Sequence, residues 1–338
     1  MAKSVCQTRR STGRAQRRRA SGVLRVMRPS PRVNRPKHQH WVPQFYLRYF
    51  ATSESCDSEQ AQVWIFSKDD ADGDETLTNV RNVCGKRYLY TPLDDSGERL
   101  WHLDEKIQSL EMTMGAIWPA IAEGFIDLGD STIRKGLSLF VAVLHLRNPE
   151  TRRAVEVAHR QIIQLFEDAP TKPDGTPDVE TIEVSGVVHQ LNATEWHKYR
   201  NWAKNDHDRF FIHVIESEAI RTAELLMRKR WSIVMTERDV FVTTDKPVVL
   251  QHQSRPTFGL GTPGVIVSFP LGPKRLLVMD DMHQEPANQY YPLHESAMGA
   301  FNLGVWRNGS RFMITGRPVH SVLSEMVCWA EAYESRDA

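Results

Sequence analysis

Apolar residues between positions 103 and 121 recur at alternating spacings of four and three, a pattern that places them on one face of a helix. The members of this stripe are Leu103, Ile107, Leu110, Met114, Ile117 and Ile121. A second stripe predicts a helix that begins near Asp130 or Ser131, both of which favour the N-cap position. Its members are Ile133, Leu137, Phe140 and Leu144. A third helix is predicted over residues 148–168, with Asn148 as its cap and Pro149 in the first turn, where proline is tolerated.

The remaining segments divide into further helices and a group of strands. Helices are predicted over residues 193–229, 294–306 and 318–333. Short segments rich in β-branched residues, separated by glycine or proline, predict strands. These segments are residues 61–69, 231–237, 239–250, 264–271 and 274–280, with a further extended segment over 81–92. Because helices and strands come in blocks, the pattern predicts an α+β fold, with a helical block and a small, mostly antiparallel sheet in one main domain, residues 38–335.

Charge is distributed unevenly along the chain, although the formal net charge is only +1. Residues 1–37 contain twelve Lys and Arg and no acidic residue, so the rest of the chain has 31 basic and 42 acidic residues, a formal charge of −11. With almost nothing apolar to bury, this basic arm is predicted to be disordered. Nucleic acid is the candidate partner, because the arm can neutralise phosphates. Two alternatives are an organellar transit segment and an upstream extension of a chain that starts at Met27.

Composition and the lack of common motifs exclude several classes of protein. The hydrophobic fraction of 41% is ordinary for a globular chain, and the longest apolar run, residues 136–146, is shorter than the ~20 residues of a membrane span. The four cysteines form no C-x-x-C pair and no secretory segment is recognisable, so a soluble, cytoplasmic protein is predicted. The phosphate-binding loop, dinucleotide-binding, nucleophile-elbow and zinc-peptidase motifs are absent. No cofactor is predicted, and no particular oligomeric state.

The segment KHQHWVPQFYLRYFA, residues 37–51, is the densest group of aromatic and histidine residues in the chain. His38 and His40 are two positions apart, which places both side chains on one side of an extended strand. Too few further ligands lie nearby for a zinc site, so no metal is predicted. A histidine bonded to backbone is one alternative, and His40 as a general acid or base is the other. A helix from Pro43 is predicted to bury Phe45, Leu47 and Phe50.

This segment resembles the H-x-V-P-Q-x-Y-L-x-x-F signature of the domain of unknown function 4238 family. The matching residues are His40, Val42, Pro43, Gln44, Tyr46, Leu47 and Phe50. The segments RNVCGKRYLYT, FVTTDKPVV and FPLGPKRLLVM resemble the later blocks of that family in the expected order, with Thr244 where serine is usual and Lys246 where asparagine is usual. The resemblance implies an intracellular, mainly microbial protein and no established activity.

Two charged residues are further candidates for a functional site, one at the end of a predicted strand and one in register with an apolar helix stripe. Asp245 ends the predicted strand in FVTTDKPVV, where it is a candidate base or metal ligand, or a turn residue that holds its own backbone ahead of Pro247. Arg147 follows the second apolar stripe in register, where a buried charge requires a partner. Glu111 and Asp245 are the candidate partners, in a structural ion pair, although a buried arginine also suits a phosphate or carboxylate ligand. A further alternative is that the helix ends before Arg147.

Two classes of function are consistent with these residues. In the first, the protein is an enzyme acting on a phosphorylated or nucleic-acid substrate, with His40 as acid or base, Arg147 holding phosphate and Asp245 orienting or activating. The additional substrate-binding candidates are His38, Gln44, Tyr46, Arg81 and Thr244. In the second, the protein is a non-catalytic binding or scaffold module, and the same residues form a polar network that fixes the core. The first class requires His40, Arg147 and Asp245 to lie together.

Overall fold

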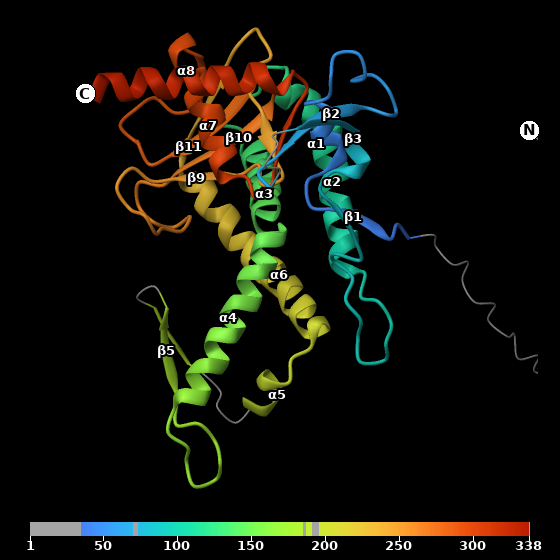
Figure 1. Cartoon of the computed structure of the whole chain (residues 1–338), viewed down its shortest axis with the longest axis vertical. Helices are drawn as coiled ribbons and strands as arrows, with labels where there is room; N and C mark the ends of the chain where they lie inside the picture. Colours follow the sequence, from blue (N-terminus) through green and yellow to red (C-terminus); the bar gives the residue numbers. More distant parts are fainter. Residues whose placement is uncertain (1–34, 70–73, 185–186, 191–195, 338) are drawn as a thin grey trace, which may run out of the picture. The chain divides into compact units, whose positions relative to one another are not determined.

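The computed structural model describes residues 35–69, 74–184, 187–190 and 196–337. The predicted disordered arm, residues 1–37, and the alternative start at Met27 lie almost wholly outside these residues. Residues 37–338 form one compact unit (Figure 1). The α+β class and the mostly antiparallel pairing predicted from the sequence are confirmed for this part of the chain.

Three long helices match the three predicted ones, the first two along their apolar stripes. They are α2 (His102–Ala122), α3 (Ser131–Leu146) and α4 (Pro149–Asp168). The predicted caps are confirmed, because the Asp130 side chain accepts from the backbone of Thr132 and Ile133, and the Asn148 side chain accepts from the backbone at the start of α4. Helix α3 ends at Leu146, so Arg147 is its C-cap and occupies the short connection to α4.

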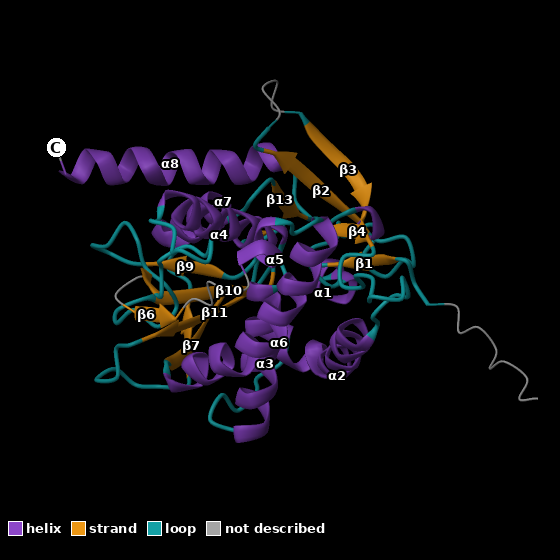
Figure 2. Ribbon diagram, turned by 90° about the horizontal axis from the view of Figure 1, so that it is seen from below, coloured by secondary structure: helices purple, strands orange, loops and turns teal. Residues whose placement is uncertain are grey.

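The region predicted as one helix over residues 193–229 contains two helices, α5 (Trp196–Arg200) and α6 (Lys204–Arg228). Its first residues, 193–195, lie outside the described chain. Helix α6 packs along α3 and contacts α4, and Figure 2 shows α3 and α6 next to each other. The C-terminal part of the chain forms a short 3-10 helix, η3 (Glu295–Ala297), followed by α7 (Met298–Asn308) and α8 (Val319–Asp337).

The strands are divided among several small sheets. The largest has the order β12-β7-β11-β10-β9, and only its β12–β7 pair is parallel. Its strands are Gln289–Pro292, Arg230–Met235, Arg275–Asp280, Ile266–Gly272 and Val249–Gln251. A four-stranded sheet has the order β3-β2-β13-β8. Its strands are Glu75–Asn79, Gln62–Ser67, Phe312–Thr315 and Thr243–Thr244.

Two further strand pairs complete the described sheets. Strand β1 (His38–His40) pairs with β4 (Gly85–Arg87), and β5 (Thr181–Val184) pairs with β6 (Val187–Gln190). The prediction of one continuous strand over residues 239–250 is wrong, because this segment forms two strands, β8 and β9, in different sheets. Pro247 lies between them and cannot donate to a strand ladder. The extended segment predicted over 81–92 contains the end of a 3-10 turn, η1 (Val80–Asn82), before β4.

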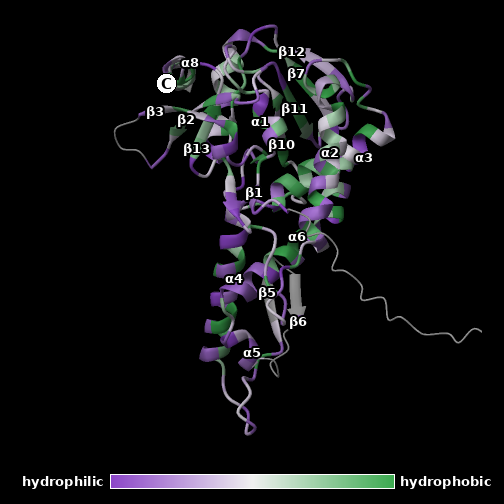
Figure 3. Ribbon diagram, turned by 90° about the vertical axis from the view of Figure 1, so that its right-hand side faces the viewer, coloured by the Kyte–Doolittle hydropathy of each residue, from purple (hydrophilic) through white to green (hydrophobic). Residues whose placement is uncertain are grey.

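The opening motif is anchored in the main hydrophobic core, as predicted. Helix α1 (Gln44–Arg48) begins directly after Pro43, and both Leu47 and Phe50 are buried, while Trp41 and Phe45 pack against the core from partly buried positions. An aromatic cluster of Tyr46, Trp118, Phe140 and Phe269 joins α1 to α2, α3 and β10. Phe269 belongs to β10, and Figure 3 shows hydrophobic residues along β10 and its neighbour β11.

Candidate functional site

Trp41, directly after β1, joins three segments that are far apart in the sequence. Its backbone N–H donates to the carbonyl of Cys84 at 2.8 Å. Its indole Nε1 donates to the carbonyl of Asp245 at 2.9 Å, and its own carbonyl accepts from Nε of Arg147 at 2.9 Å. The chain segments that carry His40, Arg147 and Asp245 therefore meet around Trp41, which is not among the predicted site residues.

Both ring nitrogens of His40 are occupied by protein groups. Nε2 lies 2.9 Å from the carbonyl of Arg81, and Nδ1 lies 3.3 Å from Nε2 of Gln44. Because a carbonyl can only accept, Nε2 carries the hydrogen and Nδ1 accepts from the Gln44 amide. Burial lowers the pKa of His40, which favours this neutral form. His40 is thus bonded to backbone, as the structural alternative requires.

Arg147 is almost completely buried, with 1% of its surface exposed. Nη1 lies 2.6 Å from Oε1 of Glu111, so Glu111 is its ion-pair partner among the two candidates from the sequence. With Nε bonded to Trp41, only Nη2 has no partner in the described chain. The carbonyl of Arg147 accepts from the hydroxyl of Tyr90 at 3.1 Å. Arg147 therefore links α2, α3, Trp41 and the Tyr90 segment.

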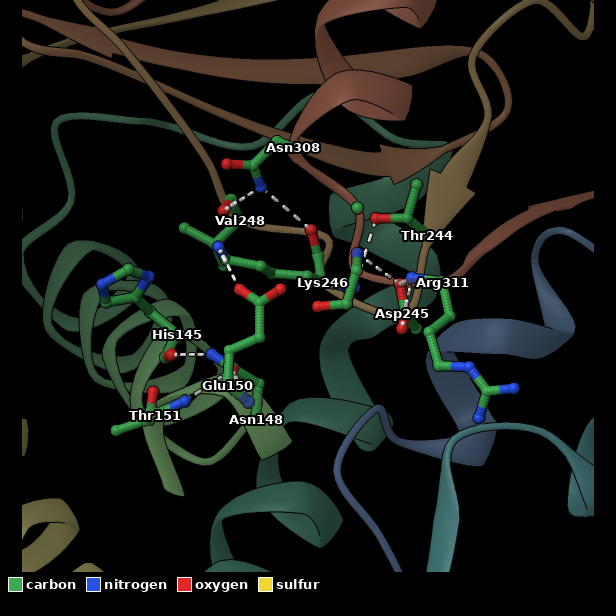
Figure 4. Close-up of polar contacts among 12 residues, drawn as sticks. His145, Asn148, Glu150, Thr151, Thr244, Asp245, Lys246, Val248, Asn308 and Arg311 are labelled. Carbon is green, nitrogen blue, oxygen red and sulfur yellow. Dashed lines mark hydrogen bonds and ion pairs between the residues drawn. The ribbon is translucent and has the colours of Figure 1, made fainter. Parts of the chain in front are cut away.

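The carboxylate of Asp245 holds the turn between α7 and β13 (Figure 4). Its Oδ1 accepts from the backbone N–H of Ser310 at 2.9 Å and of Arg311 at 3.1 Å, and its Oδ2 accepts from Arg311 at 3.0 Å. Burial raises the pKa of Asp245, and these N–H donors oppose that rise. The turn ahead of Pro247 is made by Thr244 instead, whose Oγ1 accepts from the backbone N–H of Lys246 at 3.2 Å.

Lys246 brings a second charged pair to the same place. Its Nζ lies 2.7 Å from Oε2 of Glu150, in the first turn of α4. Asn308, at the end of α7, donates from Nδ2 to the carbonyls of Lys246 and Val248 at 3.3 and 3.1 Å, as Figure 4 shows. The T-T-D-K-P segment is thus fixed by contacts from α4 and from both ends of the α7–β13 turn.

His145 lies beside this pair with a buried Nδ1 that has no partner among the described residues. Burial, with a smaller contribution from the Lys246 charge, lowers the pKa of His145 to about 4, so the ring is neutral at pH 7. The sequence pattern does not identify His145, Glu150 and Lys246 as a group. Lys246 is visible there only as a difference within the FVTTDKPVV block. The position of Glu150 after the Asn148 cap is ordinary for a glutamate at the start of a helix.

The five substrate-binding candidates do not form one exposed surface. His38 is exposed and packs its ring against that of His40, with 4.9 Å between centroids. Gln44 is held by His40, and Arg81 is exposed at the 3-10 turn. Tyr46 is fully buried, with its hydroxyl 2.8 Å from both Oγ1 of Thr243 and the carbonyl of Pro270. Thr244 is also fully buried, so Tyr46 and Thr244 have no path to a substrate in this structure.

Neither a metal centre nor a membrane span is visible in the part of the chain that the structure describes. Among the described residues, no group of three or more His, Cys, Asp and Glu side chains could hold a metal ion. No described helix is long and apolar enough to cross a bilayer. A family model described as "Protein of unknown function (DUF4238)" matches residues 38–317. No curated protein and no solved structure matches the chain.

Proposed function

Because the chain belongs to the DUF4238 family, whose description assigns no activity, we propose a function from the contacts alone: a non-catalytic binding module whose motif residues fix the fold. His40, Arg147 and Asp245 lie on segments that meet around Trp41, as a common catalytic site would require. However, their polar atoms are bonded mainly to backbone groups of other segments. The two classes of function therefore differ in whether any of these atoms is free for a substrate.

The carboxylate of Asp245 is the observation that carries this proposal. Both of its oxygens accept backbone N–H groups from residues 310–312, and the side chain is 4% exposed. A general base needs an accessible oxygen within hydrogen-bond reach of the proton that it removes. A buried carboxylate that satisfies three consecutive N–H groups is instead suited to fix a turn, since buried donors without partners are costly.

The experiment compares Asp245→Asn with Asp69→Asn. The first substitution places an NH₂ group where Oδ1 or Oδ2 accepts, so it should lower the free energy of unfolding by about 1–3 kcal/mol. Asp69 contacts Nε of the same Arg311 from a largely exposed position, and its substitution should change stability by less than about 0.5 kcal/mol. Urea unfolding measures both effects.

An activity assay on the same proteins tests the enzyme alternative. The full chain is incubated with a phosphate monoester, a phosphate diester and single-stranded RNA, and hydrolysis is followed with time. We expect no turnover that depends on Asp245. Hydrolysis that is lost in Asp245→Asn while the unfolding curve stays unchanged would show that Asp245 is catalytic, and the binding-module proposal would be wrong.

A second candidate function, an enzyme acting on a phosphorylated or nucleic-acid substrate, is favoured by one observation. The Lys246–Glu150 pair is partly exposed, at 23% and 37%, and lies beside the neutral ring of His145. An ammonium can hold a phosphate while a neutral imidazole accepts a proton. In this case Lys246→Met would abolish hydrolysis in the assay above, whereas Lys274→Met, at an exposed site elsewhere, would not.

A further inference from the structure

A cavity of about 710 Å³ lies at the junction of α1, the end of α2 and the β10–β11 turn. Its wall also includes parts of the loop at residues 51–57 and of the loop after β7. The volume is in the range of small-molecule sites in proteins, roughly 300–1,000 Å³. None of its lining residues belongs to the Asp245 region, so a ligand could bind here whether or not the chain is a catalyst.

Two arginines in the cavity wall are bonded to carbonyl oxygens and not to carboxylates. Arg48 donates from Nη1 and Nη2 to the carbonyls of Ser58 and Glu59 at 2.9 and 3.1 Å. Arg275 donates from Nη2 to the carbonyl of Glu123 at 2.6 Å. Neither guanidinium forms an ion pair with a described residue. A carbonyl satisfies a donor without cancelling its charge, so both guanidinium charges remain available to an anion.

Arg275 is the stronger of the two indications. It is 5% exposed, and its Nη1 is buried without a hydrogen-bond partner in the described chain. Its guanidinium packs over the rings of Phe125 and Tyr290, at 5.0 and 5.8 Å from their centroids. Burial lowers the pKa of Arg275, and the nearby Tyr290 and Glu123 side chains oppose this shift only in part, so its charge lacks part of the stabilisation that water would supply. An anion in the cavity would provide that stabilisation.

The rest of the wall is suited to hydroxyl groups. Asp57, Glu123 and Asp239 line the cavity, and of these only Asp239 pairs with a cation of the described chain, Lys274, at 3.8 Å. Carboxylates accept hydrogen bonds from hydroxyls, as arginines donate to phosphates. We propose that this cavity binds a small phosphorylated polyol, with its phosphate toward Arg48 and Arg275 and its hydroxyls toward the carboxylates.

Isothermal titration calorimetry on the full chain tests this proposal with four probes. Ribose 5-phosphate and glycerol 3-phosphate should each bind at one site per chain. Inorganic phosphate should bind at least about ten times more weakly, because it lacks the hydroxyls, and ribose should give no measurable heat. Equal affinity for inorganic phosphate and ribose 5-phosphate would contradict the polyol part of the proposal. No saturable binding of either phosphorylated polyol would overturn the whole proposal.

Variants locate the binding in the cavity. Arg275→Gln should reduce the affinity for ribose 5-phosphate at least about tenfold. Because Arg275 is buried and this variant can lose stability, Ser53→Tyr provides a second test from an exposed position on the cavity wall. The larger tyrosine side chain should block entry of ribose 5-phosphate while the unfolding curve stays unchanged. Ser217→Tyr, an exposed site on α6, is the matched control and should bind as the parent protein does. Unchanged affinity in Ser53→Tyr would show that the ligand binds elsewhere, and the proposal would be wrong.

Discussion

At the scale of single residues, burial decides which charges this protein can carry. His145 is a clear case, because its Nδ1 is buried without a partner in the described chain and burial lowers its pKa to about 4. In the unfolded chain a histidine has a pKa of about 6.5. The folded state therefore takes up this proton less readily than the unfolded state does, and stability must depend on pH.

We expect His145 to destabilise the fold as the pH falls from about 6.5 to about 4. In this window the unfolded state binds one proton that the folded state does not, so the free energy of unfolding decreases with falling pH, by up to about 3 kcal/mol in total. Above about pH 6.5 the contribution is constant. His145→Gln removes the titration, so its loss of stability between pH 7 and pH 4 should be smaller by that amount.

The measurement is urea unfolding at half-unit pH intervals on the parent protein and the variant. His320→Gln, at an exposed position in α8, is the control and should keep the pH dependence of the parent. If His145→Gln and the parent lose stability in parallel below pH 6.5, the ring is not held neutral by the fold.

Arg147 shows how far a side chain's partner can be predicted. Its place after an apolar stripe indicated a buried charge. Glu111, which flanks the preceding stripe, was one of two predicted partners and is the observed one. Helical periodicity made this prediction possible, because it indicates which residues lie along the same face of a helix. The partners of Asp245 are 65 to 67 positions further along the chain, in a turn. No local pattern relates those two segments, so these bonds could not be predicted.

At the scale of secondary structure, elements with strong periodicity were predicted well and short strands were not. Helices α2 and α3 match their predicted apolar stripes, since each stripe contains several turns of evidence, and α3 and α4 begin at their predicted caps. Strand β8 has only two residues. Strand β12 has four, and most of these four are exposed. Such segments have too few alternating positions to be recognised, and their pairing partners determine that they are strands.

Close packing between α7 and α8 depends on Gly299. A Cβ added there would lie 2.4 Å from the carbonyl oxygen of Glu325 and 2.5 Å from Cβ of Trp329, both in α8. Alanine favours helix by up to about 1 kcal/mol over glycine, but here the two helices would have to separate. We expect Gly299→Ala to lower the free energy of unfolding by about 1–3 kcal/mol.

Gly304 on the same helix is the matched control for that prediction. A Cβ there would meet Nε2 of Gln251 at 2.7 Å, the end of a flexible and exposed side chain that can move away. Gly304→Ala should therefore be neutral or stabilising. Thermal unfolding of the two variants separates the effects, and equal changes in melting temperature would contradict the close contact between α7 and α8.

At the scale of the whole molecule, the most marked feature is the separation of charge along the chain. Residues 1–37 have twelve basic and no acidic residues, while the remainder has a formal charge of −11. We propose that the basic segment binds nucleic acid, because a segment of this charge displaces counterions from phosphates. The acidic remainder should contribute little to such binding, since it repels phosphates.

Nucleic-acid binding should differ between the full chain and a shortened chain that begins at Lys37. The full chain should bind a 20-base-pair duplex in fluorescence anisotropy at 50 mM salt, with an affinity that falls steeply by 200 mM. The shortened chain lacks eleven of the twelve cations and should bind far more weakly, with an unchanged melting temperature. Replacing Arg17, Arg18 and Arg19 with glutamine should reduce the slope of log affinity against log salt by about 3, if each contacts one phosphate. Equal binding by the full and shortened chains would place any nucleic-acid site on residues 37–338 instead.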